Sequence, residues 1–102
     1  MGWEFYSTVG STTISYSGYS YIMDRVITLL NDTRPDDLVQ LGDDMFQVVP
    51  YNLCDEFAKL FSIALQRWTP INDQDNYYKE WLEDFTSLLK KIVKEKTMLH
   101  YC

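Results

Sequence analysis

Histidine and cysteine are scarce in this chain, which has one His and two Cys among 102 residues. General acid–base catalysis relies most often on histidine, and zinc sites are built from clusters of Cys and His. His100 stands two residues before the C-terminus, where we expect the chain to fray. This inventory predicts no enzyme, no catalytic residue, no metal site and no cofactor.

The two cysteines are far apart in the sequence and form no CxxC pair. Cys54 falls inside a predicted helix, so we interpret it as a reduced structural residue. Cys102 is predicted to be an exposed thiol that is able to link two chains. Neither residue indicates a redox or metal-binding motif.

Glycine is also scarce, and its four residues are scattered along the chain. They form neither GxGxxG nor GxxxxGK[ST], which excludes the usual phosphate-cradling loops. Asp73 and Asp75 have the spacing of the first ligands in a calcium loop, but Tyr78 occupies the position that requires glycine. We therefore predict a polar loop and a helix cap at residues 72–76.

Long apolar runs are absent, because no stretch approaches the roughly 20 residues that a membrane helix needs. The first residues also lack the basic start and apolar centre of a signal peptide, so we expect a cytoplasmic protein. The chain is 46% hydrophobic and 16% aromatic, which is enough for a core without metal or disulfides. We predict a single domain over residues 1–102.

Residues 3–17 alternate between apolar and polar side chains, as a strand pair with one buried face requires. Gly10-Ser11 fits a two-residue turn with glycine first, which predicts a β-hairpin with Val9 facing Thr12 and Phe5 facing Tyr16. The apolar face of this hairpin contains Trp3, Phe5, Val9, Ile14 and Tyr16. The other, mostly polar face contains Glu4, Tyr6, Thr8, Thr13 and Ser15.

Helical periodicity follows the hairpin, with apolar residues from Ile22 to Leu30 on one face. Residues 36–50 predict a second hairpin with Leu41 facing Phe46 and Val39 facing Val48, around a turn at Asp43-Asp44. Two amphipathic helices complete the chain, one capped by Asn52 and one starting near Asn76. The prediction is an α+β fold in which two β-hairpins form an antiparallel sheet packed against three helices, in the order ββαββαα.

Charge is distributed unevenly along the chain, whose net charge is −6. Residues 32–56 contain one base and seven acids, and an acidic surface of this kind repels nucleic acid and attracts basic proteins. The lysines from Lys90 to Lys96 are interpreted as the solvated end of the last helix, near its negative dipole end. The predicted partner-binding residues are Asp36, Asp37, Asp43, Asp44, Phe46, Tyr51, Asp55 and Glu56.

Three functional hypotheses follow from these patterns. The first is a small acidic protein-binding module, of the inhibitor, immunity or counter-defence type, that acts on a basic surface of a partner protein without binding nucleic acid or membrane. The second is a structural or regulatory homo-oligomer, joined through an aromatic sheet face or the last helix. The third is a small enzyme or ligand-binding domain, which requires a concave pocket lined by convergent polar groups.

Overall fold

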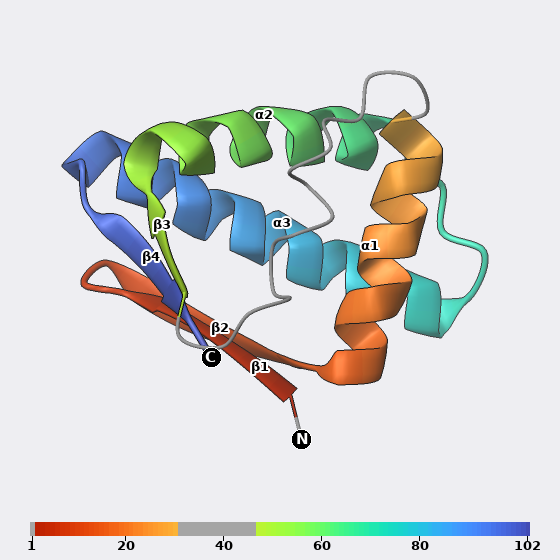
Figure 1. Ribbon diagram of the computed structural model, residues 1–102. Helices are drawn as coiled ribbons and strands as arrows, with labels where there is room; N and C mark the ends of the chain where they lie inside the picture. The colour runs from red at the N-terminus through yellow and green to blue at the C-terminus, as the bar shows by residue number, and fades with distance from the viewer. Residues whose placement is uncertain (1, 31–46) are drawn as a thin grey trace.

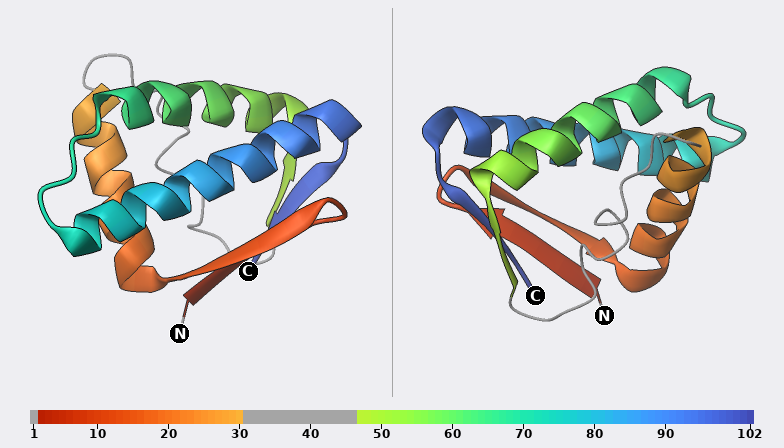
Figure 2. Two further views of the ribbon diagram at one scale, coloured as in Figure 1. Left: turned by 180° about the vertical axis from the view of Figure 1, so that it is seen from behind. Right: turned by 45° about the horizontal axis from the view of Figure 1, so that its top comes forward.

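A computed structural model describes residues 2–30 and 47–102, with the side chain of residue 47 left out (Figure 1). Its elements are β1 (Gly2–Ser7), β2 (Gly10–Ser15), α1 (Tyr16–Leu30), β3 (Gln47–Pro50), α2 (Tyr51–Arg67), α3 (Asp73–Glu95) and β4 (Met98–Tyr101). The strands form one antiparallel sheet in the order β2-β1-β4-β3. Helices α2 and α3 lie over one face of this sheet, and α1 rises from its end (Figures 1 and 2).

This architecture confirms the predicted α+β class, with one antiparallel sheet and three helices. The described elements follow the predicted order from β1 to α3. The first strand and the turn of the predicted second hairpin, together with Val39, Leu41 and Phe46 of its proposed pairs, lie outside the described residues. Strand β3 pairs with β4, so the sheet brings residues 47–50 against the C-terminal strand.

The first hairpin forms, but its predicted turn at Gly10-Ser11 is wrong. Ser7 pairs with Gly10 and Phe5 pairs with Thr12, so the chain reverses at Thr8 and Val9. The shift between the two registers is an even number of residues, so the residues that lie in β1 and β2 keep their predicted faces. Val9 lies in the turn and Tyr16 in α1, so neither takes its predicted place on the sheet. In the observed register the strand ends one residue before Tyr16, which therefore begins α1 instead of facing Phe5.

Helices α1 and α2 bury apolar stripes with helical spacing, as predicted. The start of α1 is stabilised by Ser15, whose hydroxyl accepts a hydrogen bond from the Gly18 N–H at 3.0 Å. The predicted cap of α2 at Asn52 is wrong, because the N-cap residue is Pro50 and its side chain makes no capping hydrogen bond. The buried stripe of α2 is Cys54, Phe57, Ala58, Phe61 and Ala64.

Helix α3 begins a few residues earlier than the sequence predicted. The Asn72 side chain caps it by accepting a hydrogen bond from the Asp75 N–H at 2.7 Å, which confirms the cap expected in this segment. The helix ends at Glu95, and the cap residue Lys96 has a left-handed backbone (φ 53°), which is a common way for a chain to leave a helix. The chain then turns back towards the sheet and enters β4.

Strand β4 occupies an inner position in the sheet, and the expected fraying of the C-terminus is wrong. It pairs with β1 on one side and with β3 on the other. Leu99 and Tyr101 are 0% and 3% exposed, and the backbones of Glu4 and Cys102 exchange hydrogen bonds of 3.0 and 3.1 Å. The end of the chain is thus held by both burial and strand pairing.

The core lies between the sheet and the helices and is rich in aromatic rings. Phe5 stands at its centre, with ring centroids 4.7 Å from Phe85 and 5.7 Å from Tyr101. Trp81 stacks on Phe85 with centroids 5.0 Å apart. These contacts join β1, β4 and α3. The buried face of the sheet is therefore the one that carries Phe5 and Tyr101, against the helices. No helix of the described residues is long and apolar enough to cross a membrane.

Candidate functional site

The face of the sheet that points away from the helices is covered by none of the described elements, and we call it the outer face (Figure 1). Its position follows from the alternation of side chains along a strand. Phe5, Leu99 and Tyr101 point into the core, so their neighbours in β1 and β4 point outwards. The outer face contains Glu4, Tyr6, Ser11, Thr13, Ser15, Val48, Pro50, Met98 and His100.

An aromatic stack lies at the centre of the outer face. Tyr6 and His100 are direct partners across β1 and β4, and their rings are stacked with centroids 5.3 Å apart and planes at 14°. Val48 lies opposite His100 on the other side, so the three side chains form one row across the sheet. Tyr6, Val48 and the neighbouring Met98 are 38%, 47% and 48% exposed. This row is a continuous apolar and aromatic surface open to solvent.

The strands that form the outer face contain few charged residues. None of the four described strands contains Lys or Arg, and Glu4 is their only acidic residue. Edge strands are usually protected from association by charged side chains, especially lysine. The two edge strands of this sheet, β2 and β3, contain no lysine.

Only part of the predicted acidic site falls within the described residues. Tyr51, Asp55 and Glu56 lie in the first turns of α2, where Tyr51 is 41% exposed and Glu56 is exposed. The carboxylate of Asp55 is 3.0 Å from the ammonium group of Lys59 on the same helix, which neutralises part of its charge. The other predicted residues, Asp36, Asp37, Asp43, Asp44 and Phe46, lie outside the described residues.

The sequence missed Tyr6 and His100 as candidates for a site. The alternation in β1 did place Tyr6 on the polar face of the hairpin, and an aromatic residue there was a usable signal. The position of His100 had no such signal, because the residues around it were expected to fray. Only the pairing of β4 with β1 brings the imidazole onto the tyrosine ring.

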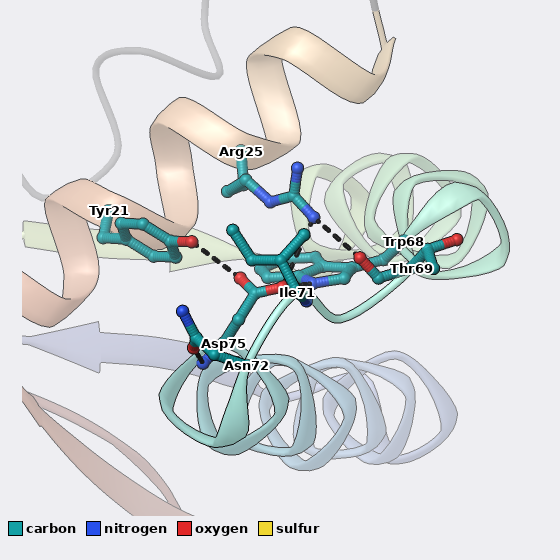
Figure 3. A network of polar contacts seen from close by, with 7 residues as sticks. All are labelled: Tyr21, Arg25, Trp68, Thr69, Ile71, Asn72 and Asp75. Atoms are coloured by element: carbon teal, nitrogen blue, oxygen red, sulfur yellow. Dashed lines mark hydrogen bonds and ion pairs between the residues drawn. The ribbon is translucent and has the colours of Figure 1, made fainter.

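A second polar centre surrounds Asp75, whose side chain is fully buried between α1 and the start of α3 (Figure 3). Its Oδ1 accepts a hydrogen bond from the Tyr21 hydroxyl at 2.7 Å. Its Oδ2 accepts from the Trp68 indole N–H at 3.0 Å and from the Ile71 backbone N–H at 3.1 Å. The Arg25 guanidinium lies 3.4 Å from Oδ2 and also covers the Trp68 ring, at 4.9 Å from its centroid.

The surroundings of Asp75 stabilise its ionised form. Burial alone would raise the pKa of Asp75, but the hydrogen bonds from Tyr21, Trp68 and Ile71 and the charge of Arg25 together lower it. A perturbed carboxyl group can mark an active site. Here, however, both oxygens are already occupied by four donors of the chain, which leaves no position for a substrate. The arrangement is that of a structural network joining α1 to the loop between α2 and α3.

This network predicts a loss of stability in acid. Because the pKa of Asp75 is lower in the folded state than its ordinary value of 3.8, the unfolded chain binds the proton more tightly. The stabilising contribution should be complete above pH 3.8 and should disappear as the pH falls through the lower folded value. Urea unfolding at a series of pH values would measure this, and Asp75→Asn should flatten the acid limb. An unchanged acid limb in that variant would contradict the prediction.

A hollow of about 470 Å³ lies where β1 and β2 meet Tyr77 of α3, and it is open to solvent along much of its surface. Glu4 is the only carboxylate among its lining residues, and the wall contains neither His nor Cys. The residues described here also contain no group of three or more His, Cys, Asp or Glu side chains that could hold a metal ion. The hollow therefore offers little of the convergent polar chemistry that the third hypothesis requires.

The two cysteines differ in their surroundings. Cys54 is buried, and its thiol points to the Val49 carbonyl at 3.8 Å. Burial raises the pKa of Cys54 to about 11, so its reactive thiolate form is rare at neutral pH. Cys102 is half-buried beside β1 instead of lying on a free tail.

The free edge of β2 is partly protected from strand addition. The backbone N–H and C=O of Glu4 form hydrogen bonds with Cys102, on the side of β1 that faces β4. Glu4 and its β2 partner Thr13 are therefore a non-hydrogen-bonded pair, and the backbone N–H and C=O of Thr13 point away from β1, towards the free edge. The Thr13 carbonyl then accepts a hydrogen bond from the Trp81 indole N–H at 2.9 Å. A partner strand would have to displace this bond, which favours the outer face over the β2 edge as a binding surface.

Comparison with known proteins gives no relative to extend these observations: no protein-family model, no curated protein and no solved structure matches the chain. The functional conclusion therefore rests on the residues and their geometry.

Proposed function

We propose that this protein is a small acidic protein-binding module that occupies a basic surface of a partner protein with the outer face of its sheet. Proteins of the inhibitor, immunity or counter-defence type act in this way, by covering a surface instead of catalysing a reaction. The observation that carries the proposal is the exposed stack of Tyr6 on His100, within an apolar row that has no Lys or Arg on its strands.

The aromatic row is suited to the centre of such an interface. Binding energy in protein complexes is concentrated in a few residues, in which tyrosine is enriched, and these cluster where water is excluded. Tyr6 is already held in one orientation by the imidazole of His100, so little conformational freedom is lost when a partner covers it. Val48 continues the row across the sheet and Met98 lies beside it, so both provide apolar area around the anchor.

The charge of the protein supports a basic partner. The net charge of −6 favours rapid association with a positively charged surface, and Glu4 places one carboxylate on the outer face itself. A nucleic acid would be repelled by the same charge. In this proposal the predicted residues Asp36, Asp37, Asp43, Asp44, Phe46, Tyr51, Asp55 and Glu56 supply contacts around the aromatic centre.

We place this function in the cytoplasm. Cys54 and Cys102 are both free thiols, and unpaired cysteines are typical of a reducing compartment. A partner found outside the cell would contradict this placement.

Substitution of the aromatic stack tests the proposal. The double variant Tyr6→Ala/His100→Ala removes both rings from the outer face and should weaken binding to the partner at least about 10-fold, because central aromatic anchors typically contribute more than 1 kcal/mol. The partner would be captured from the native host with the wild-type protein, identified and purified. Titration calorimetry would then compare the wild-type and variant affinities.

A matched control is available in Tyr77, an exposed tyrosine on α3 that is 59% exposed and lies outside the aromatic row. Tyr77→Ala should bind the partner with unchanged affinity. Glu4→Lys should slow association, and the effect should diminish as salt is added. Equal binding by the double variant, or a loss confined to Tyr77→Ala, would place the binding surface elsewhere and refute the proposal.

A further inference from the structure

The exposed side of α3 carries a stripe of charge that the proposed function does not use. Six charged residues in this stripe surround Ser87, and all seven side chains are exposed. At 3.6 residues per turn, the six lie within about 60° of Ser87 around the helix axis. The view from behind shows α3 in front, with no described element over it (Figure 2, left). The α3 stripe consists of Glu80, Glu83, Asp84, Ser87, Lys90, Lys91 and Lys94.

The charges of the α3 stripe reverse their sign about Ser87. The residues before it are acidic and those after it are basic, at equal distances along the helix. Asp84 and Lys90 lie three residues from Ser87, Glu83 and Lys91 lie four, and Glu80 and Lys94 lie seven. Lys79 and Glu95 lie at the sides of the stripe, about 80° from Ser87, and do not belong to it.

The helix dipole does not account for this arrangement. Its influence falls off within the first and last turns of a helix. Asp84 lies about three turns after the first residue of α3, and Lys90 lies more than one turn before the last. Lys94 does lie in the last turn, where the dipole favours a cation. The acidic and basic halves of the stripe meet at Ser87, however, where the dipole has little effect.

Within one chain the α3 stripe brings like charges together. Glu80 and Asp84 are four residues apart, as are Lys90 and Lys94, and pairs at this spacing repel each other on a helix. None of these four residues makes an ion pair within the described part of the chain, where the salt bridges are Arg25–Asp75 and Lys59–Asp55. A partner surface that places basic groups against Glu80 and Asp84 and acidic groups against Lys90 and Lys94 would offset both repulsions.

We propose that the partner for the α3 stripe is a second copy of this chain, docked antiparallel across a two-fold axis that passes beside Ser87. In this arrangement the acidic half of each helix lies against the basic half of the other. Glu83 then lies near Lys90 of the second copy and Asp84 near Lys91 of the second copy, at opposite edges of the contact, and the two-fold axis repeats both pairs. The small side chain of Ser87 allows the helices to approach closely at the centre.

A two-fold arrangement explains why the reversal is symmetric. A contact between copies related by a two-fold axis uses the same patch on both, so that patch must be complementary to itself. A partner of uniform charge would satisfy only half of the stripe. The contact is polar and exposed, so the dimer is weak and sensitive to salt. It leaves the outer face of each sheet free, which would make the dimer a bivalent binder.

Reciprocal charge reversal tests this proposal. Glu83→Lys/Asp84→Lys leaves Glu80 as the only acid of the stripe, and Lys90→Glu/Lys91→Glu leaves Lys94 as its only base. Sedimentation velocity at about 20 mM salt should show dimers of the wild-type protein at high concentration and only monomers of each variant. An equal mixture of the two variants should form a heterodimer, which should dissociate at about 500 mM salt.

Net charge is controlled with Asp24→Lys/Gln66→Lys, which adds positive charge at two exposed positions on α1 and α2. This variant should self-associate like the wild-type protein, and it should form no heterodimer with Lys90→Glu/Lys91→Glu. A wild-type protein that is monomeric at every concentration would overturn the proposal. So would stripe variants that dimerise as the wild-type protein does, or a mixture that stays monomeric. Circular dichroism would establish that each variant is folded.

Discussion

Replacing Asp75 by alanine is expected to lower the free energy of unfolding by about 3 kcal/mol or more. The substitution removes the acceptor of four hydrogen-bonding groups that come from α1, the end of α2 and the following loop. The Trp68 indole N–H would lose its acceptor in a buried position, and the Ile71 N–H would lose its acceptor in a partly buried one. Arg25 would also lose its ion-pair partner. Chemical unfolding followed by circular dichroism would measure the change.

Asp75→Asn separates hydrogen bonding from charge. The asparagine oxygen can take the place of Oδ2, and its amide can donate to the Tyr21 hydroxyl if that group rotates. We therefore expect this variant to lose less stability than Asp75→Ala. The exposed Asp24→Ala should change stability by no more than about 0.5 kcal/mol. A loss below about 1 kcal/mol for Asp75→Ala would mean that the network contributes little to stability.

Leu99→Ala is expected to lower the free energy of unfolding by about 3 kcal/mol, within the range for large-to-small changes in a core. Leu99 is 0% exposed, although it is only three residues before the end of the chain. It lies in β4 between β1 and β3, so a cavity at this position weakens the middle of the sheet. Guanidinium unfolding monitored by tryptophan fluorescence would measure the loss.

The neighbouring Met98 is the control for this substitution. It belongs to the same strand but is 48% exposed on the outer face, so Met98→Ala should cost no more than about 0.5 kcal/mol. A chain with a frayed C-terminus would respond weakly and equally to both substitutions. Equal small effects would therefore contradict the position of β4 in the sheet.

The outer face and the α3 stripe depend on different elements of the fold. The outer face requires β4 to be in place, because β4 carries His100 and Met98 and pairs with both β1 and β3. The α3 stripe requires only that the helix be formed and that its opposite side be buried in the core. Loss of partner binding in Tyr6→Ala/His100→Ala with retained self-association would show that the two surfaces act independently.

The sequence predicted the elements whose signal is repeated along the chain. The apolar stripes of the helices recur over several turns, so Ile22, Phe57 and Leu82 were correctly assigned to their buried faces. The faces of the hairpin residues that lie in β1 and β2 were also predicted correctly, because an even shift of register preserves the alternation. The turn was misplaced, because Gly10-Ser11 is a plausible turn and nothing local revealed that the strand must end before Tyr16.

The candidate site was much less accessible to sequence analysis. The acidic composition of residues 32–56 led to the prediction of a partner-binding site there. Of the predicted residues, Tyr51, Asp55 and Glu56 lie in the described part of the chain, in α2. Strand β4 has only four residues, too few for alternation to be recognised. Because β4 was not predicted, the stacking of Tyr6 on His100 could not be predicted either. The partners of Asp75 were also hidden, because Tyr21 and Arg25 precede it by 54 and 50 residues.

The sequence by itself determined the fold class, the buried sides of the helices and the strongly acidic character of the protein. It also contained the reversal of charge about Ser87, although the exposure of that stripe required the packing of α3. Tertiary structure alone decided that the C-terminal strand lies inside the sheet, that Tyr6 stacks on His100, and that Asp75 is buried among four donors. Periodicity is a local property of the chain, whereas these contacts join distant segments and are selected by the burial of the whole core.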